Sequence, residues 1–165
     1  MVYAVLIAAI ISAAILIILS SKNETPDKEP QCELGLPESC AQEGKERFKQ
    51  DDFAEALRYA SQGCAGGIFE SCIYEAVAAG RLEAAAPDLK KRQEVLLAGC
   101  KEHNNAMACY EYAMTLPTKS QKEVGATLSF LYKACDISKN QEYCNRYARH
   151  LRAYGLPWQP VKSSR

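Results

Sequence analysis

Eight cysteines are the side chains of this sequence best suited to chemistry, and they recur in evenly spaced pairs. Seven residues separate the members of the first two pairs and eight separate those of the last two. Zinc sites and thiol-exchange centres usually place two cysteines only two residues apart, a spacing that does not occur here. The pattern therefore predicts structural disulfides within each pair, with no metal and no other cofactor. The pairs are Cys32 with Cys40, Cys64 with Cys72, Cys100 with Cys109, and Cys135 with Cys144.

Few other side chains are suited to catalysis. The chain has two histidines, His103 in the loop-like sequence KEHNN and His150 in the last predicted helix. If every cysteine is held in a disulfide, no thiol remains for a histidine to activate. We therefore expect no catalytic residue, and a protein that is not an enzyme.

Candidate binding residues gather toward the C-terminus. Arg146, Arg149 and Arg152 recur every three residues, and this basic stripe either contacts an acidic partner or lipid head groups or is a solvated outer face. Tyr112 and Tyr147 follow a closing cysteine by three residues, where they either line a partner-binding face or pack between repeats. No basic cluster interleaves with aromatic residues outside this stripe, so we expect no nucleic-acid partner.

The segment before each of the last three opening cysteines, Cys64, Cys100 and Cys135, has the periodicity of an α-helix. Apolar residues fall eleven, seven and four positions before the cysteine, which places them with it on one helical stripe. Val124, Leu128 and Leu131 show this stripe in the last repeat. Gln93 is the exception to this stripe. It lies seven positions before Cys100, where the other repeats have leucine.

The segment after each closing cysteine predicts a second kind of helix. A small residue always stands four positions past the cysteine, which allows two helix backbones to approach closely. These residues are Gly44, Ala76, Ala113 and Ala148. Capping-box spacing marks two helix starts, at Asp52 with Glu55 and at Ser120 with Glu123. The residues predicted to end helices are Gly80, Pro117 and Gly155. The predicted helices span residues 37–49, 52–65, 69–80, 87–102, 105–116, 120–137 and 140–154.

These elements combine into a repeat of helix, cysteine, short loop, cysteine and helix. The opening cysteines recur 32, 36 and 35 residues apart. A short loop folds the two helices antiparallel and brings their cysteines within disulfide reach. The predicted fold is all-α: a right-handed α-solenoid of helix-turn-helix repeats like tetratricopeptide repeats, stapled by disulfides, over residues 32–155.

The remaining segments are predicted to lie outside the repeats. Residues 1–21 contain an uncharged apolar run, long enough to cross a hydrocarbon layer of about 30 Å as a helix. No basic start or small-residue exit marks a cleavage site, so a transmembrane helix is predicted, with a cleaved signal as the alternative. Residues 22–31 form a polar tether. The tail, 156–165, carries Trp158, which either caps the core of the last repeat or docks elsewhere.

Cysteine usage and charge bear on location. Disulfides persist in oxidising compartments, so the repeats are expected in the periplasm or an equivalent compartment of a single-pass membrane protein, or outside the cell after signal cleavage.

The formal net charge is zero, but ten acidic and four basic residues fall between 24 and 55, and six basic and one acidic between 139 and 165. The charge is therefore uneven along the chain.

The segments SQGCAGGIFESC, 61–72, and KACDISKNQEYC, 133–144, resemble the Sel-one-like repeat family. They look most like its disulfide-rich branch, which includes the Helicobacter cysteine-rich proteins and a cysteine-rich mitochondrial respiratory-chain assembly factor. The resemblance covers residues 32 to about 155 and implies an adaptor or assembly module with protein partners. Some members bind or slowly hydrolyse penicillin-type compounds, but no Ser-x-x-Lys motif occurs in this chain. A weak penicillin-binding hydrolase and a secreted effector are the alternatives.

Overall fold

The computed structural model describes residues 32, 35–82 and 89–157. In this part the chain forms seven α-helices and no strand, which confirms the predicted all-α class. The predicted bounds agree to within one residue, except at the start of α5, where the preceding residues lie outside the described part. The helices are α2 (Pro37–Lys49), α3 (Phe53–Ala65), α4 (Phe69–Arg81), α5 (Leu89–Lys101), α6 (Ala106–Thr115), α7 (Gln121–Ser138) and α8 (Gln141–Ala153).

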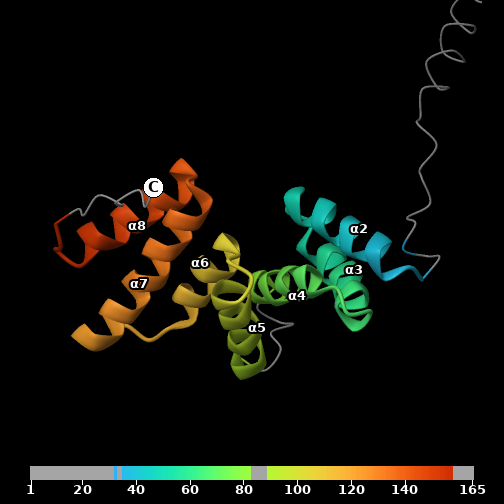
Figure 1. Cartoon of the computed structure of the whole chain (residues 1–165), viewed down its shortest axis with the longest axis horizontal. Helices are drawn as coiled ribbons and strands as arrows, with labels where there is room; N and C mark the ends of the chain where they lie inside the picture. The colour runs from blue at the N-terminus through green and yellow to red at the C-terminus, as the bar shows by residue number, and fades with distance from the viewer. Residues whose placement is uncertain (1–31, 33–34, 83–88, 158–165) are drawn as a thin grey trace, which may run out of the picture.

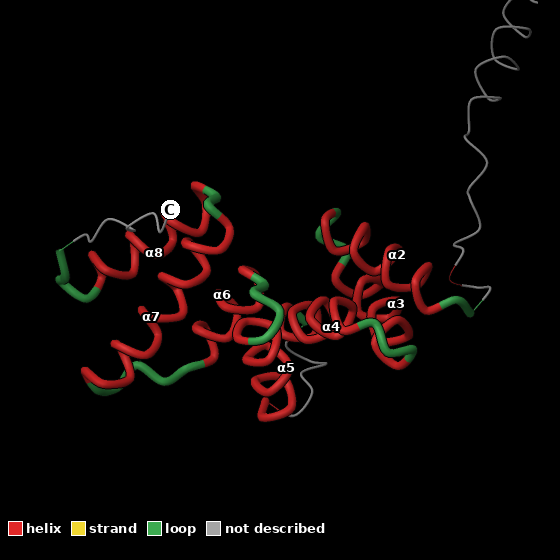
Figure 2. Tube along the Cα trace, viewed as in Figure 1, coloured by secondary structure: helices red, strands yellow, loops and turns green. Residues whose placement is uncertain are grey.

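The helices follow one another in chain order along the long axis of the molecule, with α2 and α3 at one end and α7 and α8 at the other (Figure 1). Each helix packs mainly on the helices before and after it, and α2 also contacts α4. Short loops make most of the connections (Figure 2). Tertiary contacts are therefore local along the chain.

The eight cysteines form the four disulfides that the spacing predicts, and none is free. Their Cα–Cα distances lie between 4.3 and 4.7 Å. The last three disulfides each join the last turn of one helix to the first turn of the next. Every closing cysteine is the fourth residue of its helix, so the repeat seen in the sequence is also a repeat of local geometry.

Polar side chains cap several helix starts. The Ser120 hydroxyl accepts from the Glu123 N–H at 3.3 Å, and the Glu123 carboxylate accepts from the Ser120 N–H at 2.8 Å, which completes the predicted capping box. Asp52 accepts from the Glu55 N–H at 3.3 Å. Gly155 ends α8 as predicted, with a φ of 66° that favours glycine.

Gly80, predicted to end α4, lies inside its last turn instead, because α4 continues to Arg81. The neighbouring helix explains why glycine is found here. A Cβ added at Gly80 would stand 2.2 Å from the guanidinium carbon of Arg92. The missing side chain therefore makes room for an arginine from α5.

The core of the described residues is thin and divided into small clusters along the array. Of the small residues four positions past the closing cysteines, Gly44, Ala76 and Ala113 are buried, and Ala148 is half-buried. Cysteine sulfur accounts for a substantial share of the interior. The largest fully buried side chains are Ile73, Leu96, Leu131 and Val77, followed by Cys40, Cys100, Cys109 and Cys135.

Among the described residues, no helix has the length and apolar character needed to cross a membrane. The predicted transmembrane helix in 1–21, the tether 22–31 and Trp158 lie outside the described residues. What the sequence predicts for them stays a prediction.

Candidate functional site

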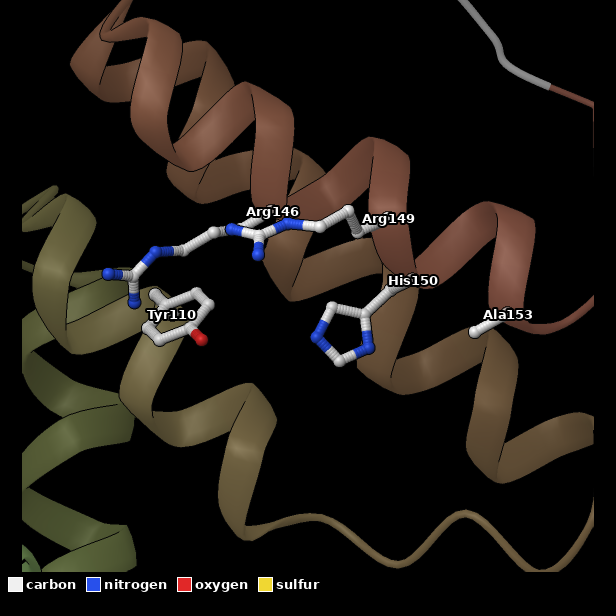
Figure 3. A pocket seen from close by; sticks show the side chains of 5 residues that line it. All are labelled: Tyr110, Arg146, Arg149, His150 and Ala153. Carbon is white, nitrogen blue, oxygen red and sulfur yellow. The ribbon is translucent and has the colours of Figure 1, made fainter.

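An open cavity of about 430 Å³ lies between α6 and α8. Tyr110 lines it from α6, and Arg146, Arg149, His150 and Ala153 line it from α8. The α8 residues are three, one and three positions apart, so they share one face of the helix. In Figure 3 both guanidinium groups and the imidazole turn toward the Tyr110 side of the cavity. We call these five residues the basic cavity.

Arg146 is held in place by two contacts. Its guanidinium carbon lies 4.7 Å from the centroid of the Tyr110 ring, a cation–π contact. Its guanidinium also pairs with Glu142, one helical turn earlier. Tyr110 in turn packs on Tyr143, with ring centroids 5.7 Å apart. The Arg146 guanidinium is therefore oriented before any ligand arrives.

Two arginines, Arg146 and Arg149, make the cavity electropositive, whereas His150 adds a neutral imidazole. Arg149 is exposed, and among the described residues it has no ion pair. Burial lowers the pKa of His150 below its ordinary value, and the charge of Arg149 lowers it further. His150 is therefore largely neutral at pH 7, with one ring nitrogen able to donate and the other to accept. The positive charge of the cavity comes from the two arginines.

The predicted arginine stripe is divided by the structure. Arg146 and Arg149 line the basic cavity, whereas Arg152 is exposed on α8 and is not among its lining residues. Sequence reasoning missed Tyr110 and His150 as cavity residues. The spacing of four between Arg146 and His150 was a usable signal, because it places both on one face of α8.

The two tyrosines proposed as partner contacts pack inside the protein. Tyr112 is half-buried, and its ring meets Phe130 edge to face at 4.7 Å. Tyr147 is only 6% exposed and packs edge to face on Tyr132 at 5.7 Å, beside a second cavity. Both rings thus make packing contacts between helices, and the expectation that either tyrosine contacts a partner stays a prediction. In both cases α7 supplies the ring partner, Phe130 for Tyr112 of α6 and Tyr132 for Tyr147 of α8.

A buried ionic cluster joins three helices and was not anticipated from the sequence. Glu111 of α6 is 4% exposed and pairs with Arg81 of α4, and it lies 3.8 Å from a guanidinium nitrogen of Arg92 of α5. Burial raises the pKa of Glu111, and the attraction of the arginines only partly opposes this rise. Burial also lowers the pKa of Arg92. The cluster ties α4, α5 and α6 together at the cost of desolvating its charges.

Gln93, the departure from the apolar stripe, belongs to the same region. Its amide nitrogen donates to the Thr115 carbonyl at 3.2 Å and to the Thr115 hydroxyl at 3.1 Å. Gln93 thereby satisfies a carbonyl at the C-terminal end of α6. The interruption in the stripe was therefore the one sequence signal that the interface of α5 with α6 is polar.

Glu111→Gln tests whether burial dominates the energetics of the cluster. Because the folded-state pKa of Glu111 is raised, its stabilising contribution is complete below the ordinary glutamate pKa and is lost as the pH rises through the folded value. We therefore expect wild type to lose stability relative to Glu111→Gln as the pH rises above the ordinary glutamate pKa of about 4.3. Urea unfolding measured across this range checks the trend, with the exposed Glu102→Gln as a control. If the difference in unfolding free energy between wild type and Glu111→Gln stayed constant with pH or changed in the opposite direction, the attraction of the arginines would outweigh the effect of burial on Glu111.

The other candidates for catalysis do not converge. His103 stacks on Phe69 with ring centroids 4.1 Å apart, whereas His150 faces the basic cavity. All eight cysteines are paired in disulfides, so none has a free thiol. Within residues 32, 35–82 and 89–157, no group of histidine, cysteine or acidic side chains could hold a metal ion. The basic cavity is therefore the candidate functional site that the rest of the structure positions best.

Comparison of the chain with protein-family models, with curated proteins and with solved structures finds no match.

Proposed function

We propose that this protein is an interaction or assembly module without enzymatic activity. Its repeats would form a right-handed α-solenoid, held to a membrane by the N-terminal segment. The observation that supports this proposal is that disulfide-linked helices pack in chain order with contacts between neighbours. Proteins built in this way expose extended surfaces to a partner and need no enclosed active site.

The disulfides support a proposal about the compartment. Four of them are consistent with an oxidising or secreted environment, because cytosolic thiols are kept reduced. We propose the periplasm or an equivalent compartment, with the membrane anchor retained. Intact mass of the purified protein distinguishes this from secretion, since cleavage would remove the apolar segment from the measured mass.

Proximity labelling tests the proposal in the living cell. The full chain, fused at its C-terminus to a labelling enzyme active in an oxidising compartment, is expected to label a reproducible set of proteins. A fusion of residues 1–31 alone to the same enzyme is the control for membrane location. An identical labelled set from both fusions would contradict a role for the repeats in partner binding. Turnover of a chromogenic β-lactam by the purified protein, abolished by a point substitution, would favour the hydrolase alternative.

A further inference from the structure

We propose that the basic cavity binds the carboxylate groups of an acidic peptide segment of a partner protein. This inference rests on the proposed function, because it specifies the chemistry of the partner. Two guanidinium groups, a phenol and an imidazole surround an open space of about 430 Å³. That volume suits a few side chains of a peptide rather than a folded domain.

The geometry favours carboxylates for a physical reason. A guanidinium presents paired N–H donors that match the two oxygens of a carboxylate. Arg146 is already oriented by Tyr110 and Glu142, so little side-chain entropy is lost when a ligand binds. The Tyr110 ring and the Ala153 methyl group supply apolar surface for the aliphatic stem of a glutamate.

The carboxylates of the chain do not neutralise both arginines of the cavity. Arg146 is offset by Glu142, but Arg149 has no ion pair among the described residues. The nearby Glu111 lies within electrostatic range of Arg146, yet it is already shared by two other arginines. A carboxylate entering the cavity would therefore meet a net positive site.

The acidic helices of a second copy are poor candidates for this ligand. Four of the six glutamates on α2, α3 and α4 already have basic partners on the same helices or on a neighbouring helix. The pairs are Glu43 with Arg47 at 2.8 Å, Glu46 with Lys49 at 2.7 Å, Glu55 with Arg58 at 2.7 Å, and Glu70 with Lys45 at 3.0 Å. Occupying the basic cavity would require breaking such pairs, so we assign the ligand to a different protein.

The two histidines of the chain allow a direct test by NMR. The full-length protein, with its disulfides intact and in a non-ionic detergent, is titrated with a glycine peptide carrying several glutamates and neutral blocked ends. The His150 ring signal is expected to shift saturably while that of His103, stacked on Phe69, does not. The same peptide with glutamine in place of glutamate is expected to produce no saturable shift.

Matched variants on α8 distinguish the cavity from general attraction to a basic helix. Arg149→Gln is expected to weaken peptide binding about tenfold, the effect of losing one charge-assisted contact worth about 1.4 kcal/mol. Arg152→Gln removes the same charge from an exposed residue outside the cavity lining, and should change the affinity less than about twofold, as expected for a screened charge. Equal losses in the two variants would overturn the proposal.

Two further titrations test whether the cavity prefers carboxylate or phosphate groups. Inorganic phosphate and phosphatidylglycerol micelles are titrated under the same conditions, and tighter binding of either than of the glutamate peptide would overturn the peptide assignment in favour of phosphate groups. The proximity-labelling experiment, repeated with Arg149→Gln, tests the interaction function and the role of the basic cavity separately. An unchanged set of labelled partners would leave the interaction function standing but exclude the basic cavity as its site. Selective loss of labelled proteins in Arg149→Gln, but not in Arg152→Gln, would support it.

Discussion

Reduction of the four disulfides is expected to unfold the protein at room temperature. A ring of nine or ten residues closed by a disulfide stabilises the folded state by about 2.5 kcal/mol on the chain-entropy estimate, so four rings contribute on the order of 10 kcal/mol. The total stability of an ordinary domain is about 5 to 15 kcal/mol. Far-UV circular dichroism before and after treatment with a phosphine reductant measures the loss of helix directly.

Single disulfides are expected to differ in their contributions, because their surroundings differ. Cys100 and Cys109 are fully buried against Ala134, whereas Cys64 and Cys72 are half-buried. Replacing a buried pair by alanine removes packing contacts in addition to the covalent link. We therefore expect the double alanine variant of Cys100 with Cys109 to lose about 4 kcal/mol, and that of Cys64 with Cys72 about 2.5 kcal/mol.

Chemical denaturation of the two double variants beside the oxidised wild type checks this order. Both variants keep the other three disulfides, so each serves as a control for the other. Equal losses would show that burial of the sulfur adds nothing to ring closure. Retention of full helicity after complete reduction would contradict the whole account, including the inference of an oxidising compartment.

Much of the fold could be predicted because its main constraints are local in sequence. Each of the last three opening cysteines lies one turn past a helical stripe, and each closing cysteine occupies the fourth position of the next helix. A disulfide ring this small leaves little freedom in the loop that joins the two helices. Helix bounds and disulfide pairing thus depend on residues that are near one another in the sequence.

The basic cavity and the buried ionic cluster were harder to predict, because both bring together side chains of helices that are far apart in sequence. Arg81 and Glu111 are 30 residues apart in sequence, and the packing of both α4 and α6 on α5 brings them together. Tyr147 also shows that contacts between helices cannot be predicted from local sequence. Its position past a closing cysteine indicates one face of α8, but it does not indicate that Tyr132 of α7 covers that face.

Gly44 is expected to be the most sensitive single position at a helix crossing. A Cβ at Gly44 would stand 2.9 Å from the backbone nitrogen of Ala60 and 3.2 Å from its Cα, so α2 and α3 would have to separate. Backbone atoms, unlike the end of a flexible side chain, cannot rotate away. We expect Gly44→Ala to cost about 2 kcal/mol and Gly44→Val about 3 kcal/mol, despite the better helix propensity of both residues.

Gly125 gives the matched control for this prediction. It is an exposed glycine within α7, and a Cβ there would meet nothing within 4 Å. Gly125→Ala is therefore expected to stabilise the protein by about 0.5 to 1 kcal/mol, the ordinary gain from replacing glycine in a helix. The same substitution thus has opposite signs at the two positions, which thermal unfolding of the oxidised variants can measure. If Gly44→Ala also stabilised the protein, glycine at this crossing would not be a packing requirement, and the small residues shared by the repeats would need another explanation.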